Sequence, residues 1–142
     1  MVLNSNDIQN ILPHRQPFLL VDRIDEIEIG YGAKGIKCVT ANEAQFIGHF
    51  PQEHVMPGVL IIESLAQVGA VAILSHEKYK GKIAYFAGIK NAKFRKKVIP
   101  GDVMVLDSKL TKLRGSIGLA NCVAKVNDEI VCECELIFAI GK

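Results

Sequence analysis

The sequence predicts an α+β fold in which an antiparallel sheet wraps around one long apolar helix. Residues 59–74 form the most apolar stretch of the chain, and they are apolar on nearly every helical face. After "KYKGK" the pattern changes to strand-like runs that are separated by turn residues. A helix that is apolar on nearly every face must be covered by other parts of the protein on nearly every side, which an antiparallel sheet curled around it can do. Because one chain of this size can hardly cover it fully, we also expect a homo-oligomer.

The N-terminal part is predicted to hold a short helix and two paired strands. Residues 5–12 are predicted to form the helix, which Ser5 caps and Pro13 ends. Residues 18–29 are rich in β-branched and apolar residues and are predicted to form a strand. After a turn at "GYGAKG", the segment "IKCVT" is expected to pair back onto it.

A long connection and the main helix follow. Residues 41–58 are marked by Pro and Gly, and long ordered loops of this kind are often functional. The helix is expected to begin at Pro57, whose missing N–H would be unpaired there anyway, and to run to about Glu77. The remaining strands are predicted near residues 82–89, 92–98, 103–113, 118–126 and 130–140.

Composition limits the classes of function. The length of 142 residues suits a single domain over residues 1–142. With 17 Lys and Arg against 15 Asp and Glu, the net charge of +2 is too small to indicate a nucleic-acid partner. The apolar stretch is shorter than a membrane span and contains Glu63 and Gln67, and there is no signal-peptide pattern. We therefore expect a cytoplasmic protein without a membrane span. Its cysteines are expected to be small core residues in a reducing compartment: Cys38, Cys122, Cys132 and Cys134.

Glu63 is a single carboxylate within the apolar helix. Three of its four neighbours at i±3 and i±4 are apolar, so burial is expected to raise its pKa. A carboxylic acid that stays protonated near neutral pH can donate a proton. The alternative is a structural Glu that pairs with an Arg or reaches the edge of the helix.

Two further groups near Glu63 suggest catalysis. His49 lies in "GHFP", where Pro51 excludes a helix interior, and histidine readily accepts a proton at neutral pH. Alternatively, His49 only forms a hydrogen bond within the loop and takes no part in catalysis. Gly58 lies in the first turn of the helix, where backbone N–H groups lack intrahelical partners and can stabilise negative charge on a carbonyl oxygen. We expect no metal site, because H-E-x-x-H is absent and Pro51 breaks the helical register that a zinc motif needs.

Three blocks in this order resemble the (3R)-hydroxyacyl-[acyl-carrier-protein] dehydratases of bacterial type II fatty acid synthesis. They are "LPHRQPFLLVDRI" (12–24), "GHFPQEHVMPGVLIIESLAQ" (48–67) and "FAGIKNAKFRKKVIPGD" (86–102). The resemblance covers nearly the whole chain and implies the hot-dog fold. It also implies a dimer with shared sites, commonly assembled as a trimer of dimers, and no cofactor.

The resemblance also implies roles for individual residues. His49 removes the α-proton, the N–H of Gly58 polarises the thioester carbonyl, and Glu63 helps the β-hydroxyl leave as water. The loop histidine of one subunit meets the helix carboxylate of the other. The product is a trans-2-enoyl thioester, which makes the protein a hydro-lyase. The related dehydratase/isomerases normally have Asp where this chain has Glu63, so the resemblance favours dehydration without isomerisation.

The substrate and its carrier need surfaces of their own. An acyl chain needs an apolar tunnel, and its candidate residues, most of which equally fit a plain core, are Phe50, Val59, Ile62, Gln67, Tyr85, Phe86, Ala87 and Phe94. By resemblance, Tyr85 or Phe86 gates this tunnel.

A basic run is interpreted, from the resemblance, as a docking patch for the acidic carrier protein with its phosphopantetheine arm. The alternatives are a solvated strand face and a nucleic-acid surface, although the latter lacks a set of stacking aromatics. The basic residues are Lys90, Lys93, Arg95, Lys96 and Lys97.

Two other functions remain open at this point. A thioesterase of the same fold would release free thiol, but such enzymes usually lack the loop histidine found upstream of "MPG". A non-catalytic protein that binds acyl carrier protein would need neither His49 nor Glu63.

Overall fold

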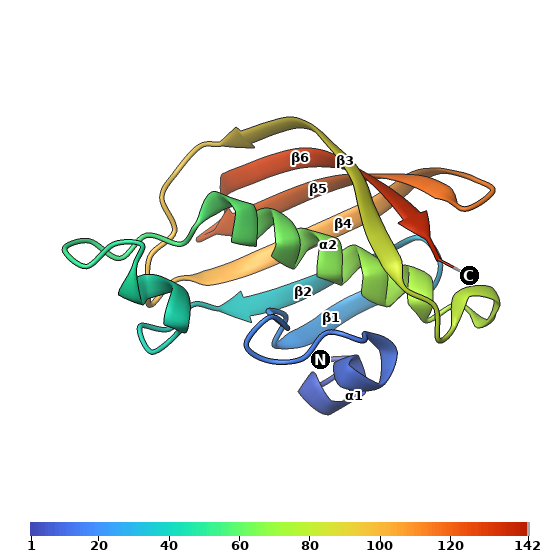
Figure 1. Cartoon of the computed structure of the whole chain (residues 1–142), viewed down its shortest axis with the longest axis horizontal. Helices are drawn as coiled ribbons and strands as arrows, with labels where there is room; N and C mark the ends of the chain where they lie inside the picture. Colours follow the sequence, from blue (N-terminus) through green and yellow to red (C-terminus); the bar gives the residue numbers. More distant parts are fainter. Residues whose placement is uncertain (142) are drawn as a thin grey trace.

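One long helix lies across the concave face of a curved sheet. The computed structural model describes residues 1–141 and places α2 (Gly58–Leu74) against a six-stranded sheet in which every pairing is antiparallel (Figure 1). The strand order is β1-β2-β4-β5-β6-β3. The predicted α+β architecture is therefore confirmed. The other elements are α1 (Ser5–Ile11), β1 (Arg23–Glu28), β2 (Gly32–Cys38), β3 (Ala84–Phe94), β4 (Val103–Arg114), β5 (Ile117–Val126) and β6 (Glu129–Ile140), with short 3-10 turns at Ala44–Ile47 and Glu77–Tyr79.

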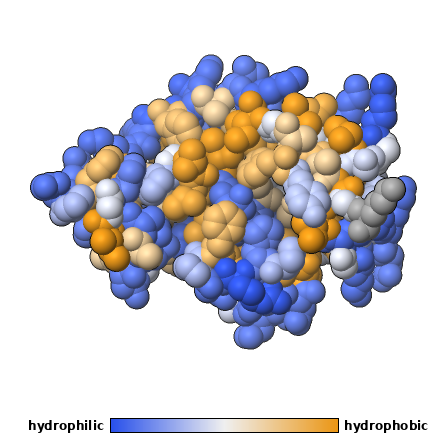
Figure 2. All heavy atoms as spheres, viewed as in Figure 1, coloured by the Kyte–Doolittle hydropathy of each residue, from blue (hydrophilic) through white to orange (hydrophobic). Residues whose placement is uncertain are grey.

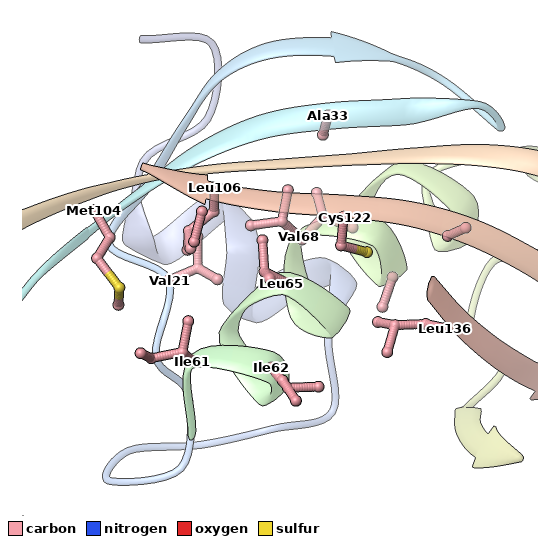
Figure 3. Close-up of a cluster of buried hydrophobic side chains, with 14 of the residues drawn as sticks. Val21, Ala33, Ile61, Ile62, Leu65, Val68, Met104, Leu106, Cys122 and Leu136 are labelled. Carbon is pink, nitrogen blue, oxygen red and sulfur yellow. The ribbon is translucent and has the colours of Figure 1, made fainter. Parts of the chain in front are cut away.

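The core lies between α2 and the sheet. Leu65 and Val68 of the helix are fully buried, and Figure 3 shows them beside Leu106 and Cys122 of the central strands. Burial of such side chains is the main source of stability, about 1.5–3 kcal/mol for each large aliphatic group. The Ser108 hydroxyl donates a 2.6 Å hydrogen bond to the carbonyl oxygen of Leu65, which ties the helix to β4. The position of the helix on the sheet is thus fixed by packing and by a buried polar contact.

A glycine lets β2 approach the helix closely. A Cβ atom added at Gly35 would lie 3.0 Å from both Ile24 Cδ1 and Val68 Cγ2. That distance is shorter than ordinary van der Waals contact, so a larger residue would push β2 away from α2.

Several predicted boundaries were wrong in detail. Helix α2 ends at Leu74 instead of about Glu77, because Ser75 closes it through its hydroxyl, which donates to the carbonyl of Val71. Strand β1 starts at Arg23 instead of residue 18, because the N–H groups of Phe18 and Leu19 bond back to the carbonyl of Arg15 in a turn. The segment "GYGAKG" is not a turn throughout, since β2 already begins at Gly32.

The two strands predicted at 82–89 and 92–98 are one strand, β3, which ends at Phe94. The pairing with β6 shifts register between Lys90 and Lys93, where Asn91 has a φ of 52°. Asn tolerates this left-handed conformation better than most residues, so the strand bulges instead of ending.

Strand β3 forms an edge of the sheet with large apolar side chains in solvent. Tyr85 is 56% exposed, and Phe86, Ile89 and Phe94 are exposed as well. Figure 2 shows apolar side chains gathered on the face of the molecule that carries β3 and α2. Exposed apolar patches on sheet edges are typical of interaction sites.

Two further predictions concern the burial of the cysteines and the absence of a membrane-spanning helix. Cys122, Cys132 and Cys134 are buried as predicted, but Cys38 is exposed, because it ends β2 at the surface. Within residues 1–141, no helix is long and apolar enough to cross a membrane.

Candidate active site

The loop before α2 is anchored at its start by a buried ion pair. The Lys37 ammonium lies 2.6 Å from Oε1 of Glu43, and both side chains are largely buried. The other carboxylate oxygen, Oε2, accepts a hydrogen bond from the N–H of Thr40. Burial alone would raise the pKa of Glu43, but the hydrogen bonds from Lys37 and Thr40 outweigh it and hold this pKa below its ordinary value. The start of the loop is therefore fixed by charge.

His49 is held in a single orientation within this loop. Its Nδ1 lies 2.6 Å from the carbonyl oxygen of Val55, and its ring stacks on Phe50 with a centroid distance of 4.0 Å. Because a carbonyl oxygen only accepts hydrogen bonds, Nδ1 carries the hydrogen and Nε2 keeps its lone pair. The backbone of His49 is fixed as well, since its N–H donates to Gln45 and its carbonyl accepts from Val55. His49 is thus held with the lone pair of Nε2 available to accept a proton.

Gly58 is the first residue of α2, where the backbone N–H has no carbonyl of its own helix to bond. The Phe94 ring packs directly over it, so that a Cβ atom at this position would lie 2.6 Å from Phe94 Cε1. The N–H of Met56 donates to the carbonyl of Val98, which joins this end of the loop to the segment that follows β3. Only glycine fits beneath Phe94 in this arrangement.

Glu63 lies one and a half turns further along α2, with its side chain only 14% exposed. Its Oε2 accepts a 2.9 Å hydrogen bond from Gln67 Nε2 and lies 3.7 Å from His14 Nε2. Burial raises the pKa of Glu63 above its ordinary value, although Gln67 and His14 act in the opposite direction. The direction predicted from the apolar neighbours on the helix is confirmed.

An apolar cavity extends from Glu63 between α2 and the sheet. The helix side is formed by residues spaced three or four apart, which share one face: Glu63, Ala66, Gln67, Ala70 and Ile73. The opposite wall comes from β3 to β6 and includes Tyr85, Phe86, Ser108, Cys122 and Phe138. Its lining is predominantly apolar, as a site for an acyl chain requires.

The chain is similar to known proteins over nearly its whole length. The model of the FabA-like domain matches residues 12–135. The chain belongs to the FabA-like family. Two full-length relatives are named 3-hydroxyacyl-[acyl-carrier-protein] dehydratase FabZ. The one from Clostridium botulinum (strain Loch Maree / Type A3) is 64% identical over 140 residues, which cover 99% of this chain and 97% of that protein. The one from Clostridium novyi (strain NT) is 56% identical over 142 residues, which cover all of both chains.

Solved structures share the fold of this FabA-like chain at low sequence identity. A structure of the dehydratase heterocomplex ApeI:P from Xenorhabdus doucetiae has a TM-score of 0.81 at 16% identity and covers 95% of this chain and 91% of that chain. A hypothetical thioesterase with coenzyme A from Streptococcus pneumoniae TIGR4 has a TM-score of 0.65 at 9% identity, with 84% of each chain covered. These likenesses confirm the hot-dog fold.

The structure separates the two halves of the site predicted for this FabA-like chain. Glu63 lines the cavity, whereas His49 and Gly58 are not among its described lining residues. Of the eight residues predicted for the tunnel, Gln67, Tyr85 and Phe86 line the cavity. Ile62 is buried elsewhere in the core. The other four lie exposed in this single chain: Phe50, Val59, Ala87 and Phe94.

The basic run predicted to bind a carrier is partly neutralised within the chain. Arg95 donates two hydrogen bonds to Glu133, Lys96 pairs with Glu129, and Lys97 lies 3.0 Å from Glu53. Lys90 and Lys93 are exposed on β3 without a salt bridge among the described residues. Only part of the run is therefore a source of unpaired positive charge.

Sequence reasoning missed His14 as a neighbour of Glu63. His14 lies in the block "LPHRQPFLLVDRI", which carried part of the family resemblance, but no spacing rule connects residue 14 to a residue on a distant helix. The wall residues Ala66, Ala70 and Ile73 did carry a signal, because they follow Glu63 at helical spacing.

Proposed function

We propose that this protein dehydrates (3R)-3-hydroxyacyl-[acyl-carrier-protein] to the trans-2-enoyl thioester in fatty acid elongation. The names of relatives at 56–64% identity support the reaction class. The observation that carries the proposal is the setting of Glu63, a carboxyl group that lines an apolar cavity and whose pKa is raised by burial. A raised pKa favours the protonated form, which can protonate a leaving hydroxyl.

The proposed chemistry uses one base, one acid and one backbone donor. His49 Nε2 takes the proton from the carbon next to the thioester, and its Nδ1–H on the Val55 carbonyl stabilises the imidazolium that forms. The N–H of Gly58 stabilises the charge that develops on the thioester oxygen. Glu63 gives its proton to the β-hydroxyl, the C–O bond breaks, and water leaves. Proton exchange with solvent then restores His49 and Glu63.

We propose that the complete site forms between two copies of the chain. Within one chain, His49 bonds to its own loop while Glu63 faces a cavity that His49 does not line. Six of the eight predicted tunnel residues are exposed in the single chain, and β3 presents an apolar edge. A dimer that joins these surfaces would cover them and bring His49 of the partner to Glu63. Assembly of three such dimers and a cytoplasmic location are part of the same proposal.

We also propose that the carrier protein docks near Lys90 and Lys93. These cations face solvent on β3, whereas Arg95, Lys96 and Lys97 already have carboxylate partners. The double variant Lys90→Ala/Lys93→Ala is expected to raise KM for carrier-bound substrate, with the rise shrinking at high salt. The matched change Lys96→Ala should have less effect. Equal effects of the two variants would contradict this assignment.

The function is tested by turnover of purified protein on 3-hydroxyacyl-[acyl-carrier-protein], followed by formation of the conjugated enoyl product. His49→Ala and Glu63→Gln are each expected to lower kcat by roughly 10²- to 10⁴-fold. His54→Ala is the matched control, because His54 is an exposed histidine in the same loop. Wild-type rates in both variants would refute the roles given to His49 and Glu63, and release of free thiol without enoyl product would indicate a thioesterase instead.

A further inference from the structure

The segment between α1 and β1 forms a polar wall beside Glu63. His14 lines the same cavity as Glu63, and its ring stacks on Phe18 at a centroid distance of 6.0 Å. The Arg15 guanidinium donates hydrogen bonds to the carbonyls of Leu12 (2.9 Å) and His14 (2.6 Å). The backbone that carries His14 is therefore held in place before any substrate binds.

Gln67 connects this segment to Glu63 with every hydrogen-bonding atom of its amide in use. Its Oε1 accepts from the N–H of Leu20 at 2.8 Å. Its Nε2 donates to the carbonyl of Phe18 at 2.7 Å and to Oε2 of Glu63 at 2.9 Å. The two amide hydrogens are thus both committed, and the amide cannot flip without losing three bonds. Oε2 of Glu63 is consequently fixed as an acceptor.

His14 lies near the same carboxylate oxygen of Glu63. Its Nε2 lies 3.7 Å from Oε2 of Glu63, just beyond hydrogen-bond length. Its Nδ1 is buried and has no partner among the described residues. An imidazole nitrogen that faces a carboxylate is suited to donate, so the hydrogen belongs on Nε2.

We propose that His14 is a positioning residue that, together with Gln67, makes Oε2 the charge-bearing oxygen of Glu63 and leaves the transferable proton on Oε1. This inference rests on the proposed dehydratase function. When the Oε1–H bond breaks, the proton joins the β-hydroxyl oxygen, the C–O bond breaks with its electron pair staying on the departing water, and a negative charge remains on Glu63. Gln67 already donates to Oε2, and His14 completes the second bond by a small approach. Donors placed before the reaction lower the cost of forming this charge.

The other titratable groups around the cavity do not provide this interaction. Tyr31 lies at the β1–β2 turn, Tyr85 on β3 and Cys122 on β5, and none of them carries positive charge in its protonated form. Among the described lining residues, His14 is the basic group, and its Nε2 lies 3.7 Å from the Glu63 carboxylate.

The decisive experiment measures the titration of Glu63 by ¹³C NMR of protein labelled at the Glu side-chain carboxyl, with Glu63→Gln used to assign the signal. In His14→Phe, which removes the donor but keeps a ring, Glu63 is expected to titrate at higher pH than in the wild type, because its charged form has lost a partner. His14→Gln, which retains an N–H donor, should titrate nearer the wild type. His76→Phe, a matched change on the segment after α2, should leave the titration unmoved. If His14→Phe does not fold, His14→Met replaces it.

Kinetics supply the second measurement. His14→Phe is expected to lower kcat about tenfold, to leave KM within about twofold, and to shift the alkaline limb of the pH profile upward. An unchanged Glu63 titration in His14→Phe would overturn the inference, as would a loss of kcat with an unmoved pH profile. The NMR titration needs no turnover, so a wild type that fails to dehydrate the substrate would refute the proposed function while the titration still decides the role of His14.

Discussion

Two carboxylates of this chain are both removed from water, yet their pKa values move in opposite directions. Glu43, at the start of the loop before α2, has a lowered pKa, whereas Glu63, on α2, has a raised one. Burial pushes both pKa values upward, so the difference comes from their partners. Glu43 has the Lys37 ammonium at 2.6 Å, while Glu63 has a neutral amide and an imidazole at 3.7 Å.

The difference shows how local partners move the pKa of the same type of side chain in opposite directions within one chain. Glu43 is ionised and stabilises the loop that orients His49. Glu63 lacks a close cation, so burial dominates and raises its pKa, which favours the protonated form. Placing a cation close to Glu63 should lower its pKa, and removing the cation from Glu43 should raise its pKa.

The largest effect is expected from neutralising the two residues. Glu43→Gln leaves the buried Lys37 ammonium without its counterion and should lower the free energy of unfolding by about 2–3 kcal/mol. Glu63→Gln should leave stability unchanged or higher, because a neutral amide avoids the free-energy cost of burying an ionisable carboxyl group, which must either take up a proton or be buried charged. Urea unfolding at neutral pH measures both. A similar loss of unfolding free energy in the two variants would show that the two carboxylates contribute to stability in the same way.

A new cation beside Glu63 should remove its proton. In His14→Lys, an ammonium replaces the imidazole next to Oε2, so the pKa of Glu63 is expected to fall as that of Glu43 has. The ionised acid cannot donate, and kcat at neutral pH should drop by roughly tenfold or more, with partial recovery as the pH is lowered. A kcat and pH profile equal to those of the wild type would contradict this expectation.

The pH dependence of stability should have opposite signs at the two positions. The folded-state pKa of Glu43 is lowered, so its stabilising contribution is present above the ordinary carboxyl pKa and is lost as pH falls through the folded value. The folded-state pKa of Glu63 is raised, so its contribution is fully present below the ordinary value and is lost as pH rises through the folded value. Subtracting the urea stability of each Gln variant from that of the wild type across pH should give curves of opposite slope. Parallel curves would refute the comparison.

The smallest effect concerns a secondary donor to Glu43. Gln45 Nε2 lies 3.1 Å from Oε1 of Glu43, an oxygen that Lys37 already contacts. Gln45→Ala should therefore cost about 1 kcal/mol or less in thermal or urea unfolding. A loss as large as that of Glu43→Gln would mean that the amide, and not the ion pair, fixes the loop.

The sequence was informative wherever the controlling neighbours are local. The apolar residues around Glu63 on its own helix predict its raised pKa, and the position of Gly58 in the first turn predicts its unpaired N–H. Contacts between distant segments could not be predicted in this way. Examples are the Phe94 ring over Gly58 and the His14 imidazole beside Glu63, because each depends on how the sheet and the N-terminal segment pack around α2.

The strand pattern shows the same limit. Separate strands were predicted at residues 82–89 and 92–98, but pairing with β6 continues through a bulge at Asn91, because the partner strand pairs with β3 on both sides of it. The tautomer of His49 likewise depends on the Val55 carbonyl, which the loop brings within reach only after folding.

The central claim is that His49 of one copy acts with Glu63 of another. Mixing His49→Ala and Glu63→Gln subunits under conditions that allow exchange tests it most directly. In each mixed dimer, one site combines the intact His49 of one chain with the intact Glu63 of the other. Full exchange should therefore restore about a quarter of the wild-type rate. If exchange is demonstrated by mass and the rate stays at the level of the separate variants, both residues act within one chain and the account is contradicted.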